Sequence, residues 1–403
     1  MNKPSKSAFP SAGLSWNIPL MYAITFFQGM VFYAPVASLY RQVRGLSLGQ
    51  IALIESISFL LTLALELPWG LIADRIGYRL TMILSCGVFF LSKAVFWQAW
   101  SFGVFLLERV FLSAAIAGLS GVSDSILYLS SSPENNQKVL GRCSAFGTAG
   151  LLISAGLFTL FIGDNYSLAG FATVISYGIA ALLSLAIQEV RLPEAMPKTQ
   201  IKDFCQLLLS TLKDCRFLLL LVAVALFNET IQAITLWLNQ SQYLRCDIPV
   251  QAMGIIYLAV SGISLSSAIS KQVSDKMGSL TLGAVAPFLS GLMCLLLVWT
   301  RSGVLSVSAI VVMSASSALA GPLYTLVFNR QVRTADRATQ LSIFAVIMDV
   351  TSAGASLAYG RLADYSLSGA FVLGASVCVL SGAAILACRK YFIPDDYPGS
   401  DSR

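Results

Sequence analysis

The chain has 403 residues, of which 56% are hydrophobic and only 11% are charged, and its formal net charge is +6. Soluble domains carry about 25% charged residues, so this composition excludes an ordinary soluble protein and indicates an integral membrane protein. Apolar runs long enough to cross a bilayer as helices, each of about 20 residues, recur along the whole chain. They lie near residues 17–40, 48–72, 80–100, 102–128, 140–163, 167–188, 216–244, 252–272, 280–299, 304–328, 339–362 and 367–388.

The first run follows a short polar leader, MNKPSKSAFPSAG, and is too long for the apolar core of a signal peptide, so we expect it to remain as the first helix. An even number of spans places both termini on one side. Most lysines and arginines lie in the loops on that side, which predicts cytoplasmic termini in a multi-pass protein of the cell (inner or plasma) membrane. This asymmetry accounts for the net charge without a nucleic-acid partner.

The segment GLIADRIGYR, residues 70–79, joins the second and third runs and carries charges that oppose the dipoles of both. Asp74 is expected just past the C-terminal end of one helix, where the dipole is negative, and Arg79 at the start of the next, where it is positive. Both charges are therefore unfavourable for their own helices.

Two sequence matches indicate an internal repeat. GLIADRIG at 70–77 returns as KQVSDKMG at 271–278, and YSLAG at 166–170 returns as YSLSG at 365–369. Both separations are close to half the chain length. We predict an all-α integral membrane fold of twelve transmembrane helices in two pseudo-symmetric six-helix bundles. The predicted parts are an N-terminal bundle, a cytoplasmic linker and a C-terminal bundle, over residues 1–188, 189–215 and 216–403.

The motif after the second helix resembles the signature of the major facilitator superfamily, and the resemblance covers nearly the whole chain. Tyr78 departs from it, because the family usually has a basic residue there. The matching residues, with those retained in the second copy, are Gly70, Asp74, Arg75, Gly77, Arg79, Asp275 and Lys276. By resemblance these residues form a conformational gate. The alternative is a polar loop that only fixes topology.

In such a fold the two halves rock about a site near the midplane. Asp74 would then face the positive N-terminus of helix 11, near Ala338 and Thr339, and Gly70 would let the two helices approach closely.

Ionisable residues inside the spans are costly in hydrocarbon and are functional candidates. By resemblance, helices 1, 4, 7 and 10 line the cavity and helix 11 lies at the seam. We predict proton coupling by Asp349 as first choice, then Glu229, with Asp124 and Arg109 as further candidates. The alternatives are an ion pair of Arg109 with Glu108 or Glu55, and hydrogen-bonded helix contacts for the acids. Lys93 is expected to snorkel outward.

Polar and aromatic residues at similar depth form a candidate substrate site. An aromatic lining with few acids suits an amphipathic, often cationic compound, although packing is the alternative role of each ring. The candidates in helices 1, 7 and 10 are Tyr22, Phe26, Gln28, Tyr33, Asn228, Gln232, Trp237 and Tyr324.

These features favour a secondary transporter that works by proton-coupled efflux of a small amphipathic compound. Helix 5, with GRCSAFGTAGLLISAG, lacks the Gly-Pro pair usual in the family's drug/proton antiporters. The alternative is a proton-coupled uptake symporter of a small metabolite such as a sugar or organic ion. We expect a monomer in the lipid bilayer, with protons as coupling ion and sodium as the alternative.

Other classes of protein are disfavoured. The chain has no histidine and its eight cysteines form no CxxC pair, so we expect no metal and no cofactor. A membrane enzyme would need a nucleophile and base or a metal cluster, and none is evident. A receptor or scaffold usually adds a sizeable soluble domain, whereas the longest hydrophilic stretch here is the linker.

Overall fold

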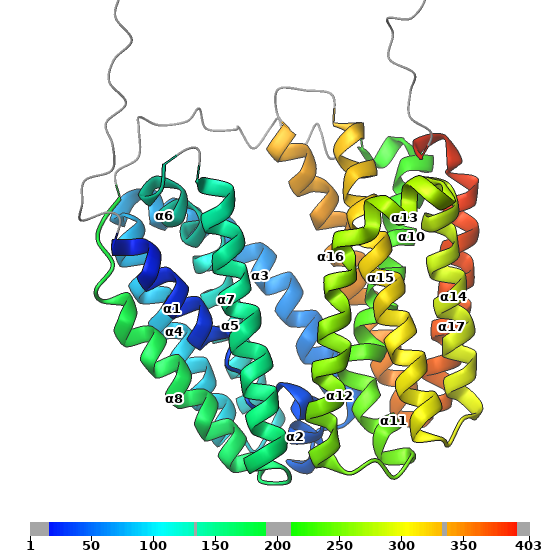
Figure 1. Cartoon of the computed structure of the whole chain (residues 1–403), viewed down its shortest axis with the longest axis horizontal. Coiled ribbons are helices and arrows are strands. Elements are labelled where there is room, and N and C mark those ends of the chain that lie inside the picture. Colours follow the sequence, from blue (N-terminus) through cyan, green and yellow to red (C-terminus); the bar gives the residue numbers. More distant parts are fainter. Residues whose placement is uncertain (1–15, 133–134, 191–210, 333–336, 393–403) are drawn as a thin grey trace, which may run out of the picture. The chain divides into compact units, whose positions relative to one another are not determined.

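The computed structural model describes residues 16–132, 135–190, 211–332 and 337–392. Within these ranges the regular secondary structure is helical (Figure 1). Twelve segments are long and apolar enough to cross a membrane, and they coincide with the twelve predicted runs. The predicted all-α membrane fold is therefore confirmed.

Helices of the first half form six of these segments. The first is divided into α1 and α2, and the fourth into α5 and α6. Their bounds are α1 Asn17–Gly29, α2 Ala37–Val43, α3 Leu48–Ile76, α4 Tyr78–Gln98, α5 Phe102–Leu119, α6 Val122–Ser130, α7 Asn136–Leu157 and α8 Tyr166–Ser184.

Helices of the second half form the other six. The seventh segment is divided into α10 and α11, and the eighth into α12 and α13. Their bounds are α10 Cys215–Gln232, α11 Asn239–Arg245, α12 Val250–Ile263, α13 Ser270–Met277, α14 Ser279–Trp299, α15 Gly303–Gln331, α16 Arg337–Tyr365 and α17 Leu367–Ala387.

The chain forms two compact units. The N-terminal unit comprises Met1–Leu46 and Ile57–Met196, and the C-terminal unit comprises Ser47–Ser56 and Pro197–Arg403. The beginning of α3 thus packs with the C-terminal unit, while the rest of this helix belongs to the N-terminal unit. Most of the predicted linker, residues 191–210, lies outside the described residues.

Five of the described membrane segments contain interruptions that the apolar pattern did not predict. The first changes to a 3-10 turn at Ala34–Val36, and the fourth turns at Gly121 with φ of 73°. The fifth ends in a π-helix at Phe158–Ile162, the seventh widens into a π-helix at Ala233–Leu238, and the eighth tightens into a 3-10 helix at Ser264–Ile269. Such irregular turns in transporters often mark binding or hinge regions, because they free backbone groups and widen the helix.

The two copies of the repeated motif turn in the same way. Gly77 between α3 and α4 has φ of 88°, and Gly278 between α13 and α14 has φ of 86°. Glycine is favoured there because other residues rarely adopt positive φ. The α3 helix continues to Ile76, so Asp74 lies in its last turn instead of past its end.

The helix 5 glycines bring α7 close to α1 within the N-terminal unit (Figure 1). A Cβ atom on Gly29 would lie 3.1 Å from the Gly147 Cα atom, and one on Gly150 would lie 3.3 Å from the Met30 nitrogen. Small residues at these positions let the two backbones approach. In this chain Gly147 and Gly150 of helix 5 therefore serve close helix packing.

Candidate functional site

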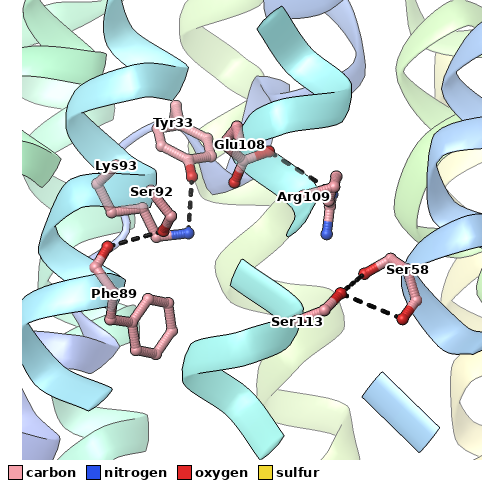
Figure 2. Close-up of polar contacts among 8 residues, drawn as sticks. All are labelled: Tyr33, Ser58, Phe89, Ser92, Lys93, Glu108, Arg109 and Ser113. Atoms are coloured by element: carbon pink, nitrogen blue, oxygen red, sulfur yellow. Dashed lines mark hydrogen bonds and ion pairs between the residues drawn. The ribbon is translucent and has the colours of Figure 1, made fainter. Parts of the chain in front are cut away.

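A buried lysine lies among aromatic rings inside the N-terminal unit (Figure 2). Lys93 on α4 is only 5% exposed, and its Nζ atom donates to the Tyr33 hydroxyl over 3.2 Å. The same nitrogen lies 5.1 Å from the ring centre of Phe89 and 5.2 Å from that of Tyr177. These cation–π contacts replace part of the lost hydration. The predicted snorkelling of Lys93 is wrong, because its side of α4 packs inside the unit.

Glu108 and Arg109 on α5 extend this polar cluster. Glu108 is 1% exposed, and its Oε2 atom lies 3.6 Å from Arg109 Nε. The Glu108 carboxyl also lies close enough to Tyr33 and Tyr177 to interact with them electrostatically. Arg109 thus makes the ion pair that sequence analysis gave as its alternative role, and its role in proton coupling remains a prediction.

A pair of serines connects α3 with α5 beside this cluster (Figure 2). The hydroxyl oxygens of Ser58 and Ser113 are 2.8 Å apart, and Ser113 also donates to the Ser58 carbonyl over 3.2 Å. Each hydroxyl is paired in the apolar interior, which avoids the cost of an unsatisfied polar group.

A second buried acid lies in the C-terminal unit. Glu229 on α10 is 2% exposed and lies one turn before the π-helix. Ser356 on α16 and Glu55 at the start of α3 lie close enough to its carboxyl to affect it electrostatically. The adjacent hydroxyls of Thr230 and Tyr359 lie 2.6 Å apart. Three helices therefore bring polar groups together around Glu229.

Asp349 is half-buried near the middle of α16. It precedes Ser356 by two helical turns, so the two residues share one side of the helix. With a rise of 1.5 Å per residue, their separation along the axis is about 10 Å. Asp124 is exposed in the first turn of α6, where a negative charge is favoured by the helix dipole.

The charges of the repeated motif have different surroundings. The Arg79 guanidinium donates to the Leu185 carbonyl over 3.4 Å, at the C-terminal end of α8. A cation is stabilised at such an end, so Arg79 has a favourable helix terminus other than its own. Arg75, Asp275 and Lys276 are exposed.

Glu189 supplies the negative charge at the start of α4. Its Oε1 atom accepts from the Tyr78 nitrogen over 3.0 Å and from the Arg79 nitrogen over 3.4 Å. Sequence analysis assigned Glu189 to the linker and missed this contact, because no local pattern links it to a helix more than 100 residues earlier.

The predicted contact of Asp74 with the start of helix 11 lies outside the described residues, since the side chains of Asp74 and of residues 337–339 are not described. Gly70 has no heavy atom within 4 Å of the position that a Cβ would occupy. The gate roles of these residues remain predictions.

The substrate candidates of the N-terminal unit lie in several environments. Tyr22 stacks on Phe146 with 5.1 Å between ring centres, and Phe26 is half-buried. Gln28 donates to the Cys86 sulfur over 3.4 Å, and Tyr33 is enclosed in the cluster around Lys93.

In the C-terminal unit, Asn228 and Gln232 are half-buried, one turn apart on α10. Trp237 is 7% exposed, and the hydroxyl of buried Tyr324 donates to the Gly283 carbonyl over 2.7 Å. Within each unit, the structure thus places several of the predicted aromatic residues in the packed interior.

A cavity of about 220 Å³ lies between α3 and the break separating α5 from α6, within the N-terminal unit. Glu66, Trp69 and Ser120 supply a carboxylate, an aromatic ring and a hydroxyl to its lining. No local sequence pattern places Glu66 beside the break in helix 4, because the two lie on different membrane segments.

Comparison with known proteins agrees with this architecture. The sequence matches the model of the Major Facilitator Superfamily over residues 20–356, so the chain belongs to this superfamily. No curated protein sequence matches it.

Among solved structures, a mutant of the nucleoside transporter NupG has a TM-score of 0.80 at 14% identity, covering 93% of this chain and 99% of that one. A bacterial homolog of the human lysosomal transporter Spinster has a TM-score of 0.72 at 17% identity, covering 96% and 98%. A D-xylose-proton symporter has a TM-score of 0.69 at 13% identity, covering 95% and 98%. At these identities the likeness establishes the shared fold.

Proposed function

We propose that this protein is a secondary transporter that couples proton movement to the passage of a small organic compound by alternating access. The burial of Glu229 carries the proposal. A carboxylate that is 2% exposed in the apolar part of a span is costly while charged. A change in its surroundings between two states therefore changes whether it holds a proton. Ser356 and Glu55 are the groups whose positions set that balance.

Glu229 thereby takes precedence over Asp349 as the proton site. Asp349 is half-buried, so its charged form costs less than that of Glu229. Its position on the side of α16 that carries Ser356 suits a second acid that passes protons to Glu229 or binds the compound. Asp124, which is exposed, is the weakest of the acidic candidates.

Efflux of an amphipathic cation is the direction we favour. Lys93 is enclosed among aromatic rings and Arg109 pairs with Glu108, so each positive charge is already compensated by neighbouring groups. The intramembrane acids Glu229 and Asp349 would attract a cationic compound. The membrane assignment that goes with this function is the cell membrane, with both termini in the cytoplasm and the protein acting as a monomer.

Uptake of a small metabolite with protons is the second candidate. The observation that favours it is the likeness of fold to the nucleoside transporter NupG and to the D-xylose-proton symporter. The same intramembrane acids serve either direction, because the direction depends on which side the compound and proton are released.

Proteoliposomes with an imposed pH gradient test the function. Tetraphenylphosphonium, uridine and xylose serve as probes for the cationic, nucleoside and sugar classes. We expect the wild type to move tetraphenylphosphonium against its gradient when protons flow the opposite way. Movement of uridine or xylose together with protons would replace efflux by uptake, and dependence on a sodium gradient instead would overturn proton coupling.

Glu229→Gln tests the proton site in the same vesicles. The amide resembles the protonated acid, so this variant should lose uphill accumulation and retain exchange at equal pH. Asp349→Asn should weaken affinity more than coupling. Asp247→Asn, in an exposed loop of the same unit, is the control. Accumulation by Glu229→Gln at the wild-type level would exclude Glu229 as the proton site.

A further inference from the structure

The cavity between α3 and the break separating α5 from α6 combines groups that favour a positive charge. Glu66 on α3 contributes a carboxylate, Trp69 contributes an indole ring, and Ser120 just past the end of α5 contributes a hydroxyl. The described lining residues all belong to the N-terminal unit. The volume of about 220 Å³ is below the roughly 300–1,000 Å³ of sites for drug-sized ligands, so the cavity suits a small compound.

Glu66 is an exposed acid within the second membrane segment. A charged side chain is costly against hydrocarbon, so such a residue faces water or a cation and marks a functional site. Within the ranges that the structure describes, Glu66 forms no ion pair with a lysine or an arginine. Its carboxylate is therefore available to a positively charged ligand in the cavity.

The end of α5 adds the negative pole of a helix to the same cavity. The Ser120 nitrogen donates to the Ile116 carbonyl over 2.9 Å, and the chain then turns at Gly121 with φ of 73°. The carbonyls that follow Ile116 thus belong to the unpaired group at a helix end, and two of their residues, Ala117 and Gly118, line the cavity. A cation is stabilised at such an end.

Close packing fixes the Trp69 ring at the wall of the cavity. A Cβ atom on Gly118 would lie 3.0 Å from the Trp69 Cδ2 atom and would also collide with the Ser85 hydroxyl. Glycine at this position lets the indole ring approach the α5 backbone. The ring is therefore held beside the free end of α5.

The Ser85 hydroxyl is a second sign of a polar ligand. Ser85 on α4 is 0% exposed, and its hydroxyl oxygen has no hydrogen-bond partner in the described part of the chain. Buried hydroxyls are normally paired, and this one lies against Gly118, which lines the cavity. A ligand with hydrogen-bond donors would supply the missing partner.

We propose that this cavity binds the ammonium group of a small primary amine. Glu66 balances its charge, and the face of the Trp69 ring adds a cation–π contact. The hydroxyls of Ser120 and Ser85 and the carbonyls at the end of α5 accept the ammonium hydrogens. A primary ammonium carries three such hydrogens and a quaternary ammonium none, so the polar lining favours the primary amine.

The amine site goes beyond the proposed transport function. Glu229 and Asp349 belong to the C-terminal unit, whereas this cavity lies within the N-terminal unit. Binding here requires no proton movement and no change between states, so it is measured at equilibrium.

Saturation-transfer NMR with the full chain in nanodiscs measures binding of butylammonium near neutral pH, with empty nanodiscs as the blank. We expect a Kd on the order of 1 mM for so small a ligand. Butanol, which has the same chain and no charge, should bind roughly tenfold more weakly or worse. Tetramethylammonium should bind roughly threefold to tenfold more weakly than butylammonium, because it donates no hydrogen bond.

Variants locate the site. Glu66→Gln keeps the size of the side chain and removes its charge, so it should raise the Kd for butylammonium roughly tenfold. Trp69→Leu should raise it roughly threefold through loss of the ring face. Asp164→Asn is the matched control, because it removes an exposed acid from a loop of the same unit. Glu229→Gln should also leave the Kd unchanged.

An unchanged Kd in Glu66→Gln, or an equal rise in Asp164→Asn, would overturn the site. A rise in Glu229→Gln without one in Glu66→Gln would place the amine in the C-terminal unit instead. Butanol binding as tightly as butylammonium would exclude a cation site, and tighter binding of tetramethylammonium would overturn the primary amine. Thermal unfolding identifies a misfolded Glu66→Gln variant, and in that case Trp69→Leu decides.

The binding measurement is separable from the transport assay. Failure of every transport probe would count against the proposed function and leave butylammonium binding to be judged on its own. Conversely, measured transport with equal butylammonium binding in the wild type and Glu66→Gln would retain the function and reject the amine site.

Discussion

Arg44 and Arg245 occupy equivalent positions in the two units, and each closes the C-terminal end of the third membrane segment of its own unit. Arg44 donates to the Trp97 and Ala99 carbonyls over 2.6 and 2.9 Å, and Arg245 donates to the Val298 carbonyl over 3.1 Å. The two arginines are separated by the same number of residues as Asp74 and Asp275. The arginine cap is therefore part of the internal repeat.

Arg44→Ala should destabilise the N-terminal unit. The variant leaves the last carbonyls of α4 without their donor and removes the guanidinium from the rings of Tyr40 and Trp100, which lie 4.2 and 4.5 Å away. We expect a loss of about 1–3 kcal/mol, the cost of leaving such groups unpaired, measured by thermal unfolding in detergent. Arg44→Lys should recover only part of it, because a lysine lacks the planar fork.

Arg301→Ala is the control for that comparison, because Arg301 is exposed. Equal unfolding midpoints for Arg44→Ala and Arg301→Ala would show that the cap contributes nothing to stability.

Arg109 and Glu108 should be energetically coupled, because their side chains form an ion pair at 3.6 Å. Either Arg109→Met or Glu108→Gln alone leaves the other charge without this partner, which costs about 3–5 kcal/mol when a buried pair is broken. The double variant should be more stable than the sum of the two single effects predicts. Thermal unfolding of all four proteins gives the coupling energy. Additive effects would mean that the two charges are balanced by other groups.

Gly360→Ala should disturb the packing of α16 against α3. In an exposed helix, alanine is more favourable than glycine by about 1 kcal/mol, but at position 360 the added methyl would contact the α3 backbone. Gly354→Ala on the same helix meets open space and should be neutral or stabilising. The comparison is made by thermal unfolding. A stabilised Gly360→Ala variant would contradict the close approach.

Asp74→Asn should slow transport with little loss of expression, because the substitution removes the negative charge and keeps the size of the side chain. The expected decrease corresponds to a helix-terminus contact of about 0.3–2 kcal/mol. Transport in proteoliposomes is compared with Asp275→Asn, the equivalent change in the second half. Wild-type rates for Asp74→Asn would support the topological role of the motif.

The membrane segments could be predicted because a span needs a long apolar run, and each run is visible locally. The turns at Gly77 and Gly278 were equally accessible through the repeated motif. The break at Gly121 was not, since a glycine within an apolar run is common in membrane helices. Its positive φ depends on how α5 and α6 pack.

The surroundings of charged residues were harder to predict. Lys93 lies on an apolar helix, and the aromatic rings around it come from the turn after α1, from α4 and from α8, so no local pattern reveals them. The capping role of Arg44 has no local signal either, because its carbonyl partners lie more than 50 residues away in sequence. Asp364 escaped notice because its partners at Ser47 and Gly49 are more than 300 residues away in sequence.

The contact of Glu189 with the start of α4 determines where the covalent connection between the units begins. Because this carboxylate is bound to the Tyr78 nitrogen and Val190 is buried, the N-terminal unit retains the chain up to residue 190. The gene could therefore be divided after this point. Two separately translated polypeptides, one ending beyond Val190 and the other beginning before α10, would each keep their own helix ends.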